Sequence, residues 1–282
     1  MLIDSFLFFQ ELDLLEIRLE YLYPFVDKFI IVESNQNFKG NSKLYNFEFN
    51  IKRYKKYLDK IEYFKIEDKH NNYSSLLEYL GNTENHVLKK IGNFIKNHNY
   101  YDKKNLFNIL DSYHRECIHL PLNKFCNDND IIIISDLDEI PSYRLLDKIK
   151  KQREFQDYLR LEQYEFQYYL NCYSNTKWLG SLITKYGYLK NKSLNSMRRS
   201  VEESKLISYG GYHFTSIGDP KTILNKIESW AHQEFNKPLI KNNIEKNITH
   251  GKDIFYRFRK ERKRVIKLEK IEIFDKRIAE II

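Results

Sequence analysis

A run of four consecutive isoleucines constrains the fold of this chain more than any other feature. The run occupies residues 131–134, between Asp130 and Ser135. An apolar β-branched run without polar alternation is typical of a central parallel strand that is buried on both faces of its sheet. Parallel strands need long crossover connections, which are usually helices. The run therefore predicts an α/β fold with a mostly parallel central sheet and helices on both faces.

Strand-like and helix-like segments alternate before this run, as such a fold requires. Residues 3–8 are a short apolar run, and residues 11–23 carry leucines at helical spacing. Residues 28–33 are a second β-branched run. Further strands are expected at 61–66 and 163–171, a turn into a short strand at 210–214, and further helices at 84–98, 103–118 and 219–235.

Composition narrows the class of protein. The chain has 282 residues, 42% of them hydrophobic, with only 9 Gly and 5 Pro, so it can build a sizeable core and does not read as a low-complexity linker. No stretch approaches the roughly 20 uncharged apolar residues of a membrane-spanning helix, and no basic segment precedes the first apolar run. We therefore expect a cytoplasmic protein. Its three cysteines form no Cys-x-x-Cys pair, which indicates free thiols.

The positive charge is concentrated near the C-terminus. The formal net charge is +8, and residues 251–270 alone hold nine Lys or Arg against three Asp or Glu. We expect residues 251–282 to form a basic helical tail. Its apolar side chains could rest on an anionic membrane, which would give a peripheral membrane contact, or they could pack on the rest of the protein.

The isoleucine run ends in a turn that carries three carboxylates, Asp136, Asp138 and Glu139. In parallel α/β sheets, ligands bind beyond the carboxyl ends of the strands, which is where this turn lies. Mg²⁺ and Mn²⁺ prefer such oxygen ligands and keep positions open for substrate phosphates, so we expect Mn²⁺ or Mg²⁺ here. An acidic turn that only caps the next helix is the simpler interpretation of the same residues.

Four segments of the chain together carry a resemblance to a known family: residues 4–19, 26–33, 134–141 and 211–214. They resemble glycosyltransferase family 17, the family of β-1,4-mannosyl-glycoprotein 4-β-N-acetylglucosaminyltransferase. They occur in the family's order, and the likeness extends from residue 1 to about 255. The chain departs from the family's usual residues at Gln10, where Asn is usual, and at Tyr212, where Trp is usual. Because of these two differences, the resemblance specifies the transferred sugar less well than the class of enzyme.

The resemblance implies an inverting glycosyltransferase with the GT-A architecture. Residues 1–250 would form the catalytic domain, with a nucleotide-binding half at about 1–141 and an acceptor-binding half at about 142–250. The implied reaction is the metal-dependent transfer of a sugar, with N-acetylglucosamine the expected one, from a UDP-sugar donor. The implied acceptor is a hydroxyl of a glycan or of a lipid-linked glycan.

The same resemblance suggests roles for residues around the acidic turn. Asp138 would bind the metal directly, Asp136 would contact the ribose or reach the metal through water, and His213 would complete the metal shell or touch the diphosphate. A lone histidine is often structural instead. Arg115 could pair with the diphosphate or form an ordinary surface salt bridge. The residues expected to bind the donor are Glu11, Glu33, Lys39, Arg115 and Asp136.

Inversion requires a base that removes the acceptor hydroxyl proton from the face opposite the diphosphate. The candidates are Glu165, His232 and Glu234, and the sequence does not choose among them. Aromatic faces suit the apolar side of a pyranose, so Tyr169 and Trp178 are the expected acceptor contacts. Core packing would explain such aromatic residues equally well.

Two other function classes fit parts of the sequence. A nucleotidyl or phosphoryl transferase could use the same carboxylates, but the chain has no Gly-x-x-x-x-Gly-Lys-Ser/Thr loop to cradle phosphates. A noncatalytic nucleic-acid-binding protein would account for the charge of +8 and the 15% aromatic residues, but the excess charge is confined to the tail. We therefore expect no nucleic-acid partner.

Overall fold

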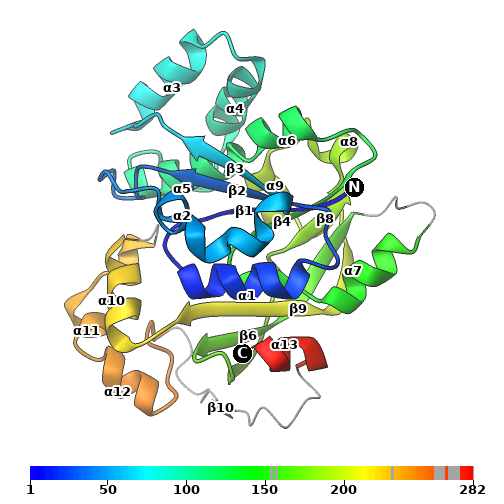
Figure 1. The fold of residues 1–282 in the computed structure, drawn as a ribbon. Coiled ribbons are helices and arrows are strands. Elements are labelled where there is room, and N and C mark those ends of the chain that lie inside the picture. Colours follow the sequence, from blue (N-terminus) through cyan, green and yellow to red (C-terminus); the bar gives the residue numbers. More distant parts are fainter. Residues whose placement is uncertain (153–154, 156–157, 230–231, 257–263, 266–273, 282) are drawn as a thin grey trace.

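The structure is a computed structural model, and it describes the chain except residues 153–154, 156–157, 230–231, 257–263, 266–273 and 282. Its described residues form an α/β fold around one ten-stranded mixed sheet (Figure 1). Helices lie on both faces of this sheet, so the predicted fold class is confirmed. No helix among the described residues has both the length and the apolar character needed to cross a bilayer.

Four parallel strands form the N-terminal half of the sheet. β1 lies between β2 and β4, and β3 is the outer strand. β4 contains the isoleucine run and is buried on both faces as predicted, because Ile132 and Ile134 belong to one apolar core and Ile133 belongs to the other. The strands are β1 (Leu2–Leu7), β2 (Lys28–Ser34), β3 (Ile61–Ile66) and β4 (Ile131–Asp136).

The two faces of these strands are covered by different sets of helices. One core contains residues of α1 (Leu12–Leu22), α2 (Asn46–Phe49), the 3₁₀ helix η1 (Ile51–Lys60) and α7 (Tyr143–Lys150). The other core contains residues of α3 (Tyr73–Asn82), α4 (His86–Asn97), α5 (Leu106–Glu116), α6 (His119–Phe125), α8 (Tyr186–Leu189) and α9 (Leu194–Arg199).

The second half of the chain adds mainly antiparallel strands beside β4. They are β5 (Glu139–Pro141), β6 (Leu159–Tyr168), β7 (Cys172–Trp178), β8 (Leu182–Lys185), β9 (Lys205–Ile217) and β10 (Arg264–Val265). The main path of the sheet runs β10-β7-β6-β8-β4-β1-β2-β3, and β9 pairs with both β5 and β6. The turn predicted at Gly210 and Gly211 is wrong, because both residues lie inside β9 and Gly211 bends the strand with a φ of +143°.

The C-terminal part of the chain adds a helical cluster and closes the core. The cluster comprises α10 (Pro220–Ser229), η2 (Gln233–Phe235), α11 (Pro238–Lys241) and α12 (Ile244–Thr249), packed around buried isoleucines. Much of the expected tail at 251–282 lies outside the described residues. Its described parts include β10, which pairs with β7, and α13 (Lys276–Ile281), which packs against α1. The three cysteines are free thiols, as predicted.

Candidate active site

The acidic turn lies between β4 and β5 and is fixed by Arg18 of α1. The Arg18 guanidinium is fully buried and forms a two-bonded ion pair with Asp4 of β1, at 2.8 and 2.6 Å. Its Nη1 donates to the carbonyl oxygens of residues 136, 137 and 139 at 2.7, 3.0 and 2.9 Å. One side chain thus satisfies three carbonyls of the turn, and this fixes the path of the backbone that carries the carboxylates.

Glu139 is a buried carboxylate that anchors the turn to the second half of the chain. Arg198 of α9 donates to both of its oxygens, at 2.8 and 2.9 Å, and Trp178 donates its indole N–H at 2.5 Å. Gly180 leaves room for these contacts, because a Cβ there would lie 1.9 Å from Glu139 Oε1. Burial opposes ionisation, but the charge and hydrogen bond of Arg198, together with the charge of His213, outweigh it and hold the pKa of Glu139 below its ordinary value.

Asp136 is held by two arginines. Its Oδ1 lies 3.2 Å from Arg115 Nη2, and its Oδ2 lies 2.7 Å from Arg198 Nη2. Burial opposes ionisation here too, but the charges of Arg198 and Arg115 hold the pKa of Asp136 well below its usual range. Arg115 also bonds Asp111 and Asn195, which fixes its guanidinium beside the turn. Two guanidinium groups are the chemistry that recognises diphosphate oxygens.

Asp138 lies beside a histidine and a lysine instead. Its Oδ1 is 3.8 Å from His213 Nε2, and its Oδ2 is 3.5 Å from Lys226 Nζ of α10, which in turn lies 3.2 Å from Glu11 Oε1. Burial raises the pKa of Asp138 above its ordinary value, because Lys226 and His213 offset the burial only in part and the other carboxylates of the turn add to the rise. A carboxylate whose charge is not fully compensated is a candidate ligand for a cation.

His213 reaches the turn through the pairing of β9 with its neighbours. It is the register partner of Glu139 on β5 and of Glu165 on β6. Its ring stacks on Trp178, with centroids 4.7 Å apart and an interplanar angle of 26°. Within the described residues, its buried Nδ1 has no hydrogen-bond partner, and Glu165 Oε2 lies 3.9 Å away. The sheet thus brings together Asp138, His213 and Glu165, which are far apart in the sequence.

The pair formed by Asp138 and His213 fits a divalent cation. Two ligands at about 2.1 Å from one ion lie roughly 3 to 4 Å apart, and the 3.8 Å between Oδ1 and Nε2 falls within that range. Mg²⁺ and Mn²⁺ sites of this kind use one or two protein ligands and complete the shell with water and phosphates. No cluster of three His, Cys, Asp or Glu placed to hold a metal occurs in the described part of the chain. Of the three expected ligands, Asp136 has both oxygens on arginines, so it would reach an ion only through water.

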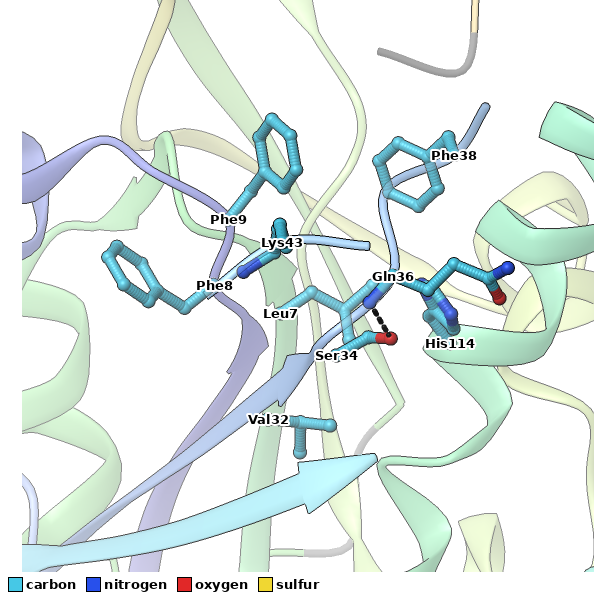
Figure 2. A pocket seen from close by; sticks show the side chains of 9 residues that line it. All are labelled: Leu7, Phe8, Phe9, Val32, Ser34, Gln36, Phe38, Lys43 and His114. Atoms are coloured by element: carbon cyan, nitrogen blue, oxygen red, sulfur yellow. Dashed lines mark hydrogen bonds between the residues drawn. The ribbon is translucent and has the colours of Figure 1, made fainter. Parts of the chain in front are cut away.

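A small cavity of about 30 Å³ lies at the carboxyl ends of β1 and β2 (Figure 2). The rings of Phe9 and Phe38 line it and stack, with centroids 6.0 Å apart. Burial lowers the pKa of His114 to about 4, so its ring is neutral at physiological pH. The cavity is lined by Leu7, Phe8, Phe9, Val32, Ser34, Gln36, Phe38, Lys43 and His114.

Glu33 and Lys39 are two of the residues expected to bind the donor. The Glu33 carboxylate is fully buried and is bonded by Lys43 at 2.5 Å, by Tyr63 at 2.9 Å and by the backbone N–H groups of residues 46 and 47. It therefore ties the loop after β2 to the sheet and is not exposed to a ligand. Lys39 is exposed within that loop.

The candidate bases and acceptor contacts lie in different places. Glu165 is 12% exposed and lies next to His213. His232 and Glu234 pair with each other at 2.9 Å and are 61% and 52% exposed. Trp178 belongs to the site through Glu139 and His213, whereas Tyr169 is half exposed at the end of β6.

A comparison with protein-family models identifies the class of enzyme. The model of glycosyltransferase family 17 matches residues 1–262. The chain belongs to glycosyltransferase family 17. The match confirms the resemblance and decides for glycosyl transfer over nucleotidyl transfer and nucleic-acid binding. No curated protein matches the sequence.

The sequence did not assign roles to three basic residues that organise the site of this family 17 glycosyltransferase. They are Arg18, Arg198 and Lys226. The buried role of Arg18 could have been recognised from the sequence, because Arg18 interrupts the apolar stripe of α1 one residue before Leu19. A charged side chain on a stripe that faces the core needs a buried partner. Arg198 and Lys226 lie on short helices among many surface cations, and no pattern distinguishes them.

Proposed function

We propose that this family 17 glycosyltransferase is metal-dependent and inverting, and that it transfers a sugar, N-acetylglucosamine being the first to test, from a UDP-sugar to a glycan hydroxyl. The observation that carries the proposal is the pair of Asp138 and His213, 3.8 Å apart, at the carboxyl end of the central strand. Family membership supports a nucleotide-sugar donor and a glycan acceptor in general. One carboxylate and one imidazole suit Mn²⁺ better than Mg²⁺, which favours oxygen ligands alone.

Different residues around the turn would bind different parts of the donor. Arg115 and Arg198 lie on the Asp136 side, where their N–H groups would bind diphosphate oxygens. Asp138 and His213 would hold the cation, which when bound would neutralise the diphosphate and stabilise the departing nucleoside diphosphate by several kcal/mol. Lys226 adds a further positive charge beside Asp138. Arg18 keeps the turn in a fixed conformation, so little reorganisation accompanies binding.

A thermal-shift screen tests the donor and the metal together. UDP, GDP, CMP and dTDP sugars are added to the full chain with Mn²⁺, with Mg²⁺ or with chelator. We expect UDP-sugar plus Mn²⁺ to raise the Tm most, since a ligand that binds only the folded state stabilises it. Stabilisation by every nucleotide sugar alike in chelator would contradict the metal-dependent proposal.

The variant Asp138→Ala tests the role of the cation ligand. We expect UDP-sugar hydrolysis or transfer to fall by a factor of about 10² or more, because the ion is no longer held in place. Asp147→Ala is the matched control, since Asp147 of α7 pairs with the exposed Lys151 that follows the helix. Full activity of Asp138→Ala would rule out the mechanism, and an equal loss in the control would indicate damage to the fold.

A further inference from the structure

Glu165 lies on the far side of His213 from the acidic turn. The three side chains form a row, with Asp138 Oδ1 at 3.8 Å from Nε2 of the ring and Glu165 Oε2 at 3.9 Å from Nδ1. The row follows from the strand pairing, because His213 faces the turn residue Glu139 on one side and Glu165 on the other. Each ring nitrogen of the histidine therefore has one carboxylate beside it.

The environment of the ring fixes its plane. Trp178 stacks against it, so the ring edges are left for polar contacts. His213 as a whole is 7% exposed, and its Nδ1 is without a hydrogen-bond partner in the part of the chain that the structure describes. A buried N–H without a partner is costly, and the Glu165 oxygen is the acceptor beside it. A movement of about 1 Å would bring the two atoms to hydrogen-bond distance.

The Glu165 carboxylate is itself held in place. Gln167 Nε2 donates to Oε1 at 2.8 Å, which leaves Oε2 directed toward His213. Glu165 also lies on the sheet, on β6, and only 12% of its side chain is exposed. This arrangement suits a group that orients a neighbour. A base for the acceptor needs an oxygen that faces the substrate.

We propose that Glu165 is a positioning residue for His213 and not the base of the reaction. It accepts the hydrogen bond of Nδ1–H and so keeps the proton off Nε2, which would leave that nitrogen free to hold a cation together with Asp138. Histidines that bind metals commonly use their second nitrogen in this way, and the partner fixes both the tautomer and the ring orientation. The inference rests on the proposed metal-dependent function.

Two variants of Glu165 separate positioning from base catalysis. Glu165→Met removes the acceptor at equal length, and Glu165→Gln keeps a carbonyl oxygen that can accept from Nδ1–H but cannot take up a proton. Mn²⁺ affinity is measured by electron paramagnetic resonance on the full chain with UDP present. We expect a loss of about 10- to 100-fold in Glu165→Met and a smaller loss in Glu165→Gln. Glu162→Met is the matched control on the same strand, since Glu162 pairs with Lys177, and it should bind Mn²⁺ normally.

The tautomer of His213 gives a readout that needs no metal. ¹⁵N spectra of histidine-labelled protein, assigned with His213→Ala, should show the Nδ1–H form in the wild type and a gain of the Nε2–H form in Glu165→Met. The melting temperature of each variant reports whether it is folded, and the spectra of Glu165→Gln replace those of Glu165→Met if the latter does not fold.

The outcomes distinguish the inference from the function on which it rests. If the wild type fails to bind Mn²⁺ with UDP, both are overturned. If the wild type binds and His213→Ala loses binding while both Glu165 variants bind Mn²⁺ normally, only the positioning role is overturned. Normal binding together with a fall in kcat of about 10² to 10⁴ in both variants would make Glu165 the base.

Discussion

Asp138 and Glu139 are neighbours in the chain, but their surroundings move their pKa values in opposite directions. Burial disfavours the charge of both. For Glu139 the charge and hydrogen bond of Arg198, together with the charge of His213, outweigh the burial, so its pKa lies below 4.5. For Asp138 the charges of Lys226 and His213 do not suffice, so its pKa lies above 3.8. The Glu139 carboxylate thus stabilises the fold, whereas the Asp138 carboxylate lowers its stability, as is common for functional residues.

The raised pKa of Asp138 predicts that Asp138→Asn will stabilise the ligand-free protein. A carboxylate with a raised folded-state pKa lowers stability at every pH above that value, and this penalty disappears as the pH falls to the unfolded value of 3.8. Asp138→Asn should therefore have the higher Tm at pH 7, and the two Tm curves should converge near pH 4. The same variant should lose Mn²⁺ binding. Circular dichroism melts between pH 3 and pH 8 measure the two Tm curves. A lower Tm of Asp138→Asn than of the wild type at pH 7 would refute the charge penalty.

Glu139→Gln should have the opposite effect on stability and destabilise the protein at pH 7. A lowered folded-state pKa gives stability that is present above the unfolded value of 4.5 and is lost as the pH falls through the folded value. The substitution also leaves the Arg198 guanidinium with one buried carboxylate fewer. We expect a loss of about 3 to 5 kcal/mol at pH 7, the usual result of removing one partner of a buried pair. Urea unfolding at pH 7 provides the measurement, and a loss below about 1 kcal/mol would show that the pair is solvated.

At the scale of elements, the pairing of β5 with β9 determines where His213 lies. The pairing is close at Gly211, whose φ is +143° and whose added Cβ would lie 2.2 Å from the Ile140 carbonyl oxygen. From the sequence alone, a glycine such as Gly211 could equally mark a place where the backbone approaches a ligand. The structure shows that it approaches the neighbouring strand, and a single sequence does not distinguish the two because both need the same missing Cβ.

Gly211→Ala should separate β5 from β9 and move His213 away from Asp138. The backbone strain alone should cost about 1 to 3 kcal/mol, and Mn²⁺ affinity should fall with it. Gly81→Ala is the matched control: this helical glycine on α3 has open space around it, so alanine should stabilise the protein by about 0.5 to 1 kcal/mol. Unfolding curves and Mn²⁺ titrations of the two variants test this. Unchanged metal binding in Gly211→Ala would mean that the pairing does not position the histidine.

At the scale of the whole molecule, the sequence predicted the parallel half of the sheet much better than the rest. Residues 131–134 could only be a strand buried on two faces, and their end located the acidic turn. In the second half, strands pair with partners that are distant in the chain, such as β5 with β9 (antiparallel) and β6 with β9 (parallel). Local patterns do not specify such partners, so the approach of His213 and Glu165 could not be predicted from sequence spacing.

The described C-terminal residues pack on the rest of the protein, which is one of the two placements that the sequence left open. Phe274 stacks on Phe166 with centroids 4.8 Å apart, and Asp275 accepts from the hydroxyls of Tyr21 and Tyr212. Deleting residues 251–282 would therefore remove core contacts along with any membrane contact. Replacing the basic residues of 257–263 by Gln, followed by liposome co-sedimentation, isolates the proposed membrane contact, which should weaken by about 1 kcal/mol per charge removed.

The packing of α13 against α1 predicts that the end of the chain stabilises the catalytic domain. Ile278 is fully buried in the same apolar core as Leu15 and Leu19, and Arg277 donates to the Tyr21 carbonyl oxygen at 2.9 Å. Ile278→Ala should lower the free energy of unfolding by about 2 to 5 kcal/mol, the usual effect of a cavity at a buried isoleucine. Glu280→Ala on the same helix, 64% exposed, should change it by less than about 0.5 kcal/mol. If both variants unfold at the wild-type urea concentration, α13 is not part of the folded core. UDP binding by Ile278→Ala is then compared with the fraction of the protein that is unfolded. If binding falls only by that fraction, α13 affects binding through stability, and the geometry of the site is unchanged.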